Sequence, residues 1–126
     1  MRYIVTLLFL VIVQIASAQS TQSRSISYIE MTESWVRIFD ESGKRVETRS
    51  RSGFGDVVGY SSTFFIVRRG SFYVIYDPYC NQLNTITASN IGEILSVSGN
   101  TFTAKDGSFI STYDKKGKKI NVRTAN

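Results

Sequence analysis

The 126-residue sequence contains no histidine, one cysteine and one proline. The lack of histidine excludes the common imidazole base, the Ser-His and Cys-His nucleophile systems and the usual zinc ligand. Cys80 has no partner within the chain, so an internal disulfide is excluded, and a disulfide between two chains is left as a route to an oligomer. We predict from these absences that the protein is not an enzyme and that it carries no cofactor and no metal.

Long apolar runs are scarce, and the clearest one lies at the N-terminus. Residues 3–13 are predominantly apolar, follow a single basic residue at Arg2, and precede small residues at Ala16 and Ala18. This is the layout of a secretory signal peptide, and the run is shorter than the roughly 20 residues of a membrane-spanning helix. We predict a signal peptide over residues 1–18, a single domain over residues 19–126, and a secreted or periplasmic location with no membrane span.

The charge is moderately basic, with 15 Lys and Arg against 10 Asp and Glu. The densest basic cluster surrounds a predicted turn and consists of Lys115, Lys116, Lys118 and Lys119. A solvated hairpin tip explains this cluster, and the alternative is a patch for anionic glycans, lipopolysaccharide or nucleic acid. Because export separates a protein from nucleic acid, we expect no nucleic-acid partner.

A repeat of 37 residues runs through the chain. The segment GSFISTYDKKGKKI begins at Gly107, GSFYVIYDPYCNQL begins at Gly70, and ESWVRIFDESGKRV begins at Glu33. Residues 54–89 align without a gap on residues 91–126, with 11 identities in 36 pairs. Glycines, aromatics and aspartates in phase to this extent indicate a true repeat. The first copy is weaker, because its opening part falls on a polar stretch.

Each repeat has the pattern of β-strands. Short segments rich in Val, Ile, Phe, Tyr and Thr are separated by Gly, Ser, Asn and Asp, and no sustained helical period is present. We predict strands at residues 56–60, 64–67, 71–76 and 83–87, and the same set one repeat later. In the DxxGK segments, the Asp accepts a hydrogen bond from the N–H two residues on, and the Gly supplies the positive φ that closes a hairpin.

An aromatic pair precedes each of these turns on one face of its strand. The pairs are Trp35 with Phe39, Phe72 with Tyr76, and Phe109 with Tyr113. Since a large ring stands at the same position in every unit, we predict that Trp35, Phe72 and Phe109 meet in one shared core.

This layout resembles a group of short exported bacterial proteins built from tandem units of the form GSWIxTYDxxGKKI. The resemblance covers the whole mature chain and rests on residues 33–46, 70–83 and 107–120. The second unit departs from the pattern, since Cys80 stands where the others have glycine. The YDxxGK part is also similar to YD-type repeats and to propeller blades. The resemblance implies exported β repeats and implies no function.

Three units of about four short strands suit a compact threefold, β-trefoil-like all-β domain, in which closure of a small barrel leaves no exposed edges. Propeller-like blades are the alternative. Propellers typically contain 4 to 8 blades, so three blades would have to associate to complete a ring.

Because the residues of the common catalytic systems are absent, we expect a binding function. Exposed aromatic residues with polar neighbours are typical of carbohydrate sites. Tyr60, Tyr73 and Tyr79 have no aromatic equivalent in the third unit, so we expect these side chains to lie on the surface and not in a core shared by the units. The predicted ligand-binding residues are Tyr60, Tyr73, Tyr79, Arg68, Arg69 and Trp35. We therefore predict an exported, non-enzymatic binding module for carbohydrate. The alternative is a protein-interaction or inhibitor module with an envelope or extracellular protein as its partner, because Tyr and Arg are enriched at binding hot spots.

Overall fold

The computed structural model describes residues 24–125, which form three antiparallel sheets, one per repeat unit. Sheet A contains β1 (Ile26–Met31), β2 (Trp35–Asp40) and β3 (Arg45–Ser50). Sheet B contains β4 (Asp56–Tyr60), β5 (Phe65–Arg69), β6 (Phe72–Tyr76) and β7 (Gln82–Thr87). Sheet C contains β8 (Glu93–Ser98), β9 (Thr101–Asp106), β10 (Phe109–Asp114) and β11 (Lys119–Thr124). Neighbouring strands are sequential in every sheet, so the predicted antiparallel β repeats are confirmed.

Two four-residue helices connect the sheets at equivalent positions of the repeat. Helix α2 (Arg51–Phe54) links sheet A to sheet B, and α3 (Ala88–Ile91) links sheet B to sheet C. Sequence periodicity did not predict them, because a single turn is too short to display a helical period. Within the described part of the chain, no helix is long and apolar enough to cross a membrane. The predicted signal segment, residues 1–18, lies outside the described residues.

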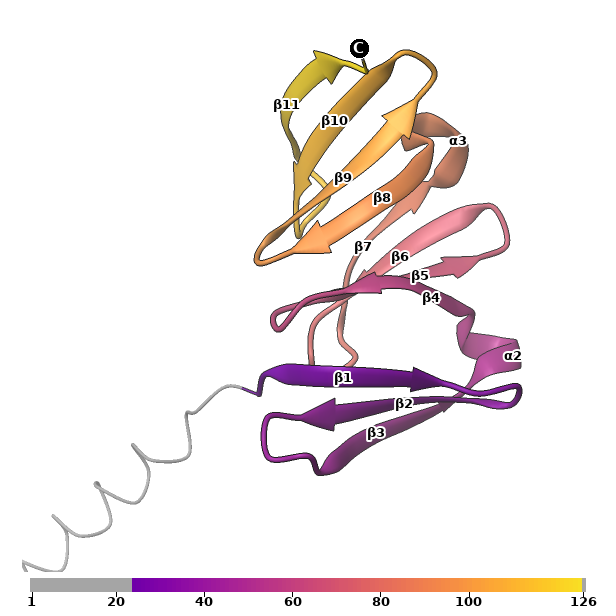
Figure 1. Ribbon diagram of the computed structural model, residues 1–126. Coiled ribbons are helices and arrows are strands. Elements are labelled where there is room, and N and C mark those ends of the chain that lie inside the picture. The colour runs from indigo at the N-terminus through magenta and orange to yellow at the C-terminus, as the bar shows by residue number, and fades with distance from the viewer. Residues whose placement is uncertain (1–23, 126) are drawn as a thin grey trace, which may run out of the picture.

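The sheets stack face to face in chain order, with sheet A at the bottom and sheet C at the top of the view (Figure 1). One apolar core lies between sheets A and B and includes Val36, Ile38 and Phe65. A second core lies between sheets B and C and includes Ile75 and Phe102. Among residues 24–125 each strand pairs only within its own sheet, so the described chain forms an open stack. The predicted β-trefoil-like closure is not formed, and the stack does not close as a propeller either.

The three leading aromatic residues do not meet in one core, and that prediction is wrong. Trp35, Phe72 and Phe109 occupy equivalent positions in sheets A, B and C, and their exposed fractions are 43%, 46% and 53%. Because the sheets stack instead of closing around an axis, equivalent faces lie in different layers. The second aromatic of the pair is the buried one in sheets B and C, where Tyr76 and Tyr113 lie in the two cores.

The stack explains an arginine on the aromatic face of the first unit. Val74 and Ser111 occupy the equivalent positions of sheets B and C, and both are largely buried on the face that is turned toward the preceding sheet. Arg37 is the matching residue of sheet A, whose corresponding face has no sheet over it within the described residues. The guanidinium therefore keeps contact with solvent, which a position between two sheets would deny it.

The Asp-led hairpin turns form as predicted. Asp40 Oδ1 accepts hydrogen bonds from the backbone N–H groups of Ser42 and Lys44, both at 3.0 Å, and Asp77 and Asp114 make the same contacts in their units. The hydrogen bond from the Ser42 hydroxyl lowers the pKa of Asp40. Gly43, Cys80 and Gly117 follow these aspartates and have φ values of +83°, +64° and +84°. The carboxylates of Asp40, Asp77 and Asp114 are therefore already hydrogen-bonded within their own turns.

We expect Gly117→Val to destabilise the protein by about 1 kcal/mol or more, because a β-branched residue resists positive φ. A Cβ at this position would also lie 2.7 Å from Ile86 Cδ1 and 2.8 Å from Asn84 Nδ2. Gly43→Val is the matched control, since its φ is nearly the same and no heavy atom lies within 4 Å of its added Cβ. Urea unfolding should show a larger loss for Gly117→Val, and equal losses would contradict the packing of this turn on sheet B.

Cys80 occupies the glycine position of the second unit, and its burial raises the pKa of the thiol to about 11. Cys80→Gly should therefore leave stability unchanged or raise it, because relief of the strained φ offsets the loss of a small, half-buried side chain. A marked decrease in the melting temperature would show that thiol packing outweighs backbone strain.

Candidate functional site

The structure does not bring the six predicted ligand-binding residues together. Tyr73 is only 5% exposed and its hydroxyl donates to the Gly92 carbonyl at 2.9 Å, so its expected place on the surface is wrong. The Arg68 guanidinium lies over the Tyr73 ring, 5.2 Å from its centroid. Tyr60 lies at the end of β4 and is partly exposed.

Arg69 has a structural role in the second unit. Its Nε donates to the Phe54 carbonyl at 2.8 Å, and its Nη2 donates to the Tyr76 hydroxyl at 2.6 Å. The guanidinium also lies 5.8 Å from the centroid of the Phe54 ring. Arg69 therefore fills the space between α2 and the aromatic face of sheet B.

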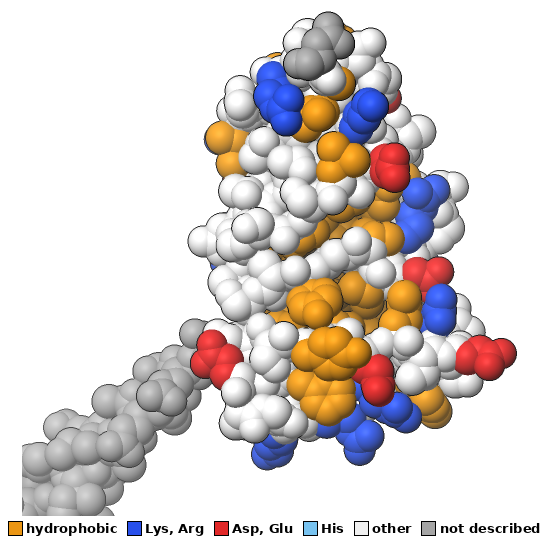
Figure 2. All heavy atoms as spheres, viewed as in Figure 1, with side chains coloured by type: hydrophobic (Ala, Val, Ile, Leu, Met, Phe, Trp, Pro, Cys, Tyr) orange, Lys and Arg blue, Asp and Glu red, His pale blue; other side chains and the backbone are white. Residues whose placement is uncertain are grey.

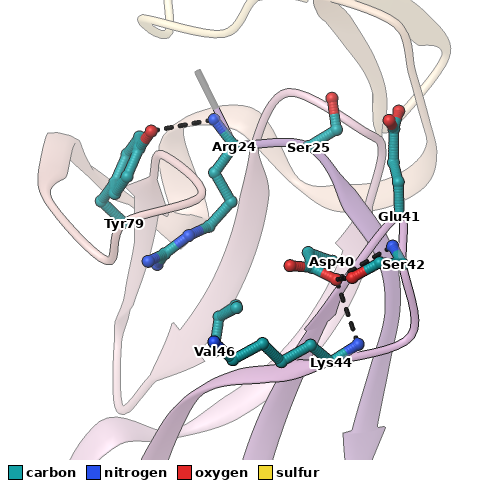
Figure 3. A pocket seen from close by; sticks show the side chains of 8 residues that line it. All are labelled: Arg24, Ser25, Asp40, Glu41, Ser42, Lys44, Val46 and Tyr79. Carbon is teal, nitrogen blue, oxygen red and sulfur yellow. Dashed lines mark hydrogen bonds between the residues drawn. The ribbon is translucent and has the colours of Figure 1, made fainter. Parts of the chain in front are cut away.

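Tyr79 lines an open hollow of about 450 Å³ beside the β2–β3 hairpin (Figure 3). The Arg24 backbone N–H donates to the Tyr79 hydroxyl at 2.9 Å, and the Arg24 guanidinium lies 4.4 Å from the ring centroid. The same guanidinium pairs with Glu47 at 2.9 Å. Across the hollow, the Asp40 carboxylate accepts hydrogen bonds from Ser42 and Lys44 of its own turn. These contacts hold the incoming chain against the turn of the second unit, so Tyr79 anchors the fold.

Trp35 lies on the outer face of sheet A, which is turned away from sheet B. The register places Tyr28, Glu30, Trp35, Arg37 and Phe39 on this face, together with Arg45, Thr48 and Ser50 of β3. The Tyr28 and Phe39 rings are 5.9 Å apart, and Glu30 pairs with Arg37 at 3.0 Å. Figure 2 shows hydrophobic side chains exposed over sheet A, with basic side chains along the lower edge of the molecule.

A smaller hollow of about 220 Å³ lies between α3 and sheet C, and we call it the α3 pocket. It is lined by Asn90, Asp106, Phe109, Ser111, Tyr113, Lys119 and Val122. The register places Phe109 beside Asp106 and Ser111 beside Val122, on the face of sheet C that packs against sheet B. The pocket is therefore the part of this face that sheet B leaves uncovered.

The pocket exists because the third unit has smaller residues than the second at two positions. Asp106 replaces Arg69, whose guanidinium fills the equivalent space under α2. Ser111 replaces Val74, which is buried in the core between sheets A and B. The short side chains of Asp106 and Ser111 therefore leave a hollow in the third unit, at the place that Arg69 and Val74 fill in the second unit.

The polar groups of the α3 pocket are available to a ligand. Ser111 is 7% exposed, and within residues 24–125 its hydroxyl has no hydrogen-bond partner. The side chains of Asn90 and Asp106 also lack partners among the described residues. The Lys119 ammonium lies over the Tyr113 ring, 6.0 Å from its centroid. The Ser111 hydroxyl is not among the fully buried polar atoms that lack a partner, so water or a ligand in the pocket can reach it.

The sequence contained one signal for this site, namely the differences between otherwise matching repeats. Asp106 opposite Arg69, and Ser111 opposite Val74, break the repeat at positions where the rest of the strand is similar. The aromatic positions that the repeats share favoured a core and did not point to this site. No group of three or more potential metal ligands occurs in the described segment.

No protein-family model matches the chain, and no curated protein is significantly similar to it.

Proposed function

We propose that the protein is an exported, non-enzymatic binding module and that the α3 pocket holds one ring of a saccharide. The observation that carries this proposal is the Ser111 hydroxyl, which has no partner among the described residues and lines a hollow that also presents the exposed ring of Phe109. Sites for small ligands are concave, mostly apolar, and contain a few convergent polar groups. The α3 pocket has this composition.

Each lining residue matches one feature of a sugar ring. The ring of Phe109 offers an apolar face for sugar C–H groups, and Val122 extends that apolar surface. Asp106 accepts hydrogen bonds from hydroxyls, Lys119 donates to them, and the Asn90 amide does both. Ser111 provides a donor and an acceptor at the bottom of the pocket. A saccharide satisfies these groups together, because its hydroxyls donate and accept at short intervals.

Binding fits the pocket better than hydrolysis does. Glycoside hydrolysis commonly uses a pair of carboxylates on either side of the scissile bond, whereas Asp106 is the one carboxylate among the described residues that line this pocket. The predicted secreted or periplasmic location places the module among glycans of the envelope or of its surroundings. The ligand of the proposal is therefore a glycan that the protein holds without changing it.

Ser111→Val should weaken saccharide binding roughly 10-fold or more, because it removes a hydrogen-bonding group that lines the pocket and fills the space as Val74 does in the second unit. A glycan array with the wild-type protein identifies the saccharide, and calorimetry with the free sugar measures the loss. Stability should stay the same or rise, since valine suits a position between two sheets.

Thr112→Val is the matched control, because Thr112 is the next residue of β10 and points to the opposite face of sheet C. It should bind as the wild-type protein does. Equal binding by the Ser111→Val variant, or equal loss by both variants, would contradict the α3 pocket as the saccharide site.

A further inference from the structure

We infer that the α3 pocket binds an amino sugar, a saccharide with a free ammonium group, and that Asp106 and Tyr113 hold this ammonium. The inference rests on the proposed function and adds the class of the saccharide. It is carried by the second unit, where the chain's own Arg69 places a cation in the equivalent space. The third unit lacks that cation, because Asp106 replaces Arg69.

The second unit shows which groups hold a cation in this space. The Arg69 Nε donates to the Phe54 carbonyl at 2.8 Å, and its Nη2 donates to the Tyr76 hydroxyl at 2.6 Å. The guanidinium carbon also lies 6.0 Å from the centroid of the Tyr76 ring. A backbone carbonyl, a phenol oxygen and an aromatic ring therefore surround the positive charge, and each of them attracts it.

The third unit keeps the two hydrogen-bond acceptors without their donor. Tyr113 is the counterpart of Tyr76, is 5% exposed and lines the α3 pocket, and its hydroxyl has no hydrogen-bond partner within residues 24–125. Ile91 is the counterpart of Phe54, and no side chain of the described segment donates to its carbonyl. A donor that enters the pocket can therefore take the place of the Arg69 guanidinium.

Asp106 adds a negative charge that the second unit lacks at this position. Its carboxylate lines the pocket and forms no ion pair with any described residue. Because an aspartate is shorter than an arginine, the hollow lies where the guanidinium would be. An ammonium has three donors and no acceptor, so it can donate to the Asp106 carboxylate and to the Tyr113 hydroxyl. A charge-assisted hydrogen bond is roughly twice as strong as a neutral one, which favours a free amine over an N-acetyl group.

Lys119 is the one basic residue among the described residues that line the pocket, and it belongs to the other end of it. Asp106 pairs with Phe109 in the register, whereas Lys119 pairs with Tyr113, four residues further along β10. Four residues of a strand span roughly 13 Å, and no ion pair joins Asp106 to Lys119. The amine of the sugar is therefore directed to Asp106, and Lys119 is left to donate to its hydroxyls.

A glycan array that presents each amino sugar both as the free amine and in N-acetylated form tests the inference at about pH 6, where the amine is protonated. In calorimetry with the sugars that bind, the wild-type protein should prefer the free amine by at least about 3-fold. Asp106→Asn removes the charge at nearly constant shape and should make the two affinities equal. Glu93→Gln is the matched control and should keep the preference, because Glu93 is an exposed carboxylate of β8 that does not line the pocket.

Asp106→Arg restores the residue of the second unit and gives an independent measurement. Its guanidinium should fill the pocket as Arg69 does, so saccharide binding should be lost while the melting temperature stays the same or rises. Wild-type binding of the free amine by this variant would overturn the inference, and so would a preference for the free amine that survives in Asp106→Asn.

The possible results separate this inference from the proposed function. If the protein binds neutral or N-acetylated saccharides as tightly as free amines, and loses that binding in Ser111→Val, the saccharide site stands and the amino-sugar inference is overturned. If the protein binds no saccharide of the array, both are overturned.

Discussion

Phe102→Ala should destabilise the protein by roughly 3 to 5 kcal/mol, whereas Phe109→Ala should cost about 1 kcal/mol or less. Phe102 is 1% exposed and lies between sheets B and C. Its ring stacks on Tyr113 at 5.1 Å and lies 6.3 Å from the Phe64 ring. Truncation leaves a cavity that a sheet-on-sheet contact closes poorly. Phe109 is half exposed, so its removal opens no enclosed space.

Urea unfolding of the two variants separates a layered stack from a shared aromatic core. Trp35→Ala and Phe72→Ala should resemble Phe109→Ala, because all three side chains are about half exposed. Losses of 3 kcal/mol or more for these three variants would restore the shared core and contradict the open stack.

Gly92→Ala should cost about 3 kcal/mol or more, because the added Cβ would collide with backbone atoms. Gly92 has a φ of +85° at the end of α3, and a Cβ there would clash with the Lys105 carbonyl oxygen and lie 2.8 Å from its carbon. A flexible side chain can move aside, whereas a paired strand of sheet C cannot. The change should therefore displace α3 from β9 and distort the α3 pocket.

Gly107→Ala isolates the contribution of backbone strain. Its φ is +61°, and no heavy atom lies within 4 Å of the added Cβ. We expect a loss of about 1 to 2 kcal/mol from the left-handed conformation alone. Equal thermal and urea stability of the two variants would contradict the close approach of α3 to β9.

The strands and turns were predictable because local chemistry determines them. Alternating apolar residues indicated the strands, and an Asp followed by Gly indicated hairpins such as that at Asp114 and Gly117. The arrangement of the units was not predictable in the same way. An aromatic pair repeated in phase is compatible with one shared core and with successive layers. Arg37 distinguishes the two, because an uncovered layer accommodates it and a shared core does not.

The candidate site was less predictable than the fold. Tyr73 and Arg69 have the residue types of a binding site, yet the first lies in a core and the second fills the space under α2. The α3 pocket depends instead on what is missing from the third unit, namely the bulk of Arg69 and Val74. Such a hollow becomes visible only when the three strands and the helix that line it have been placed.

The most direct test of the α3 pocket is an NMR titration of the labelled protein with the saccharide that the array identifies. We expect the largest shifts at the backbone amides of Asn90, Asp106, Phe109, Ser111 and Lys119. These residues come from α3 and three strands, and they converge only at the pocket. Shifts centred on the Trp35 indole or on Arg24 and Tyr79, or no shift at any sugar concentration up to about 10 mM, would contradict the proposed site.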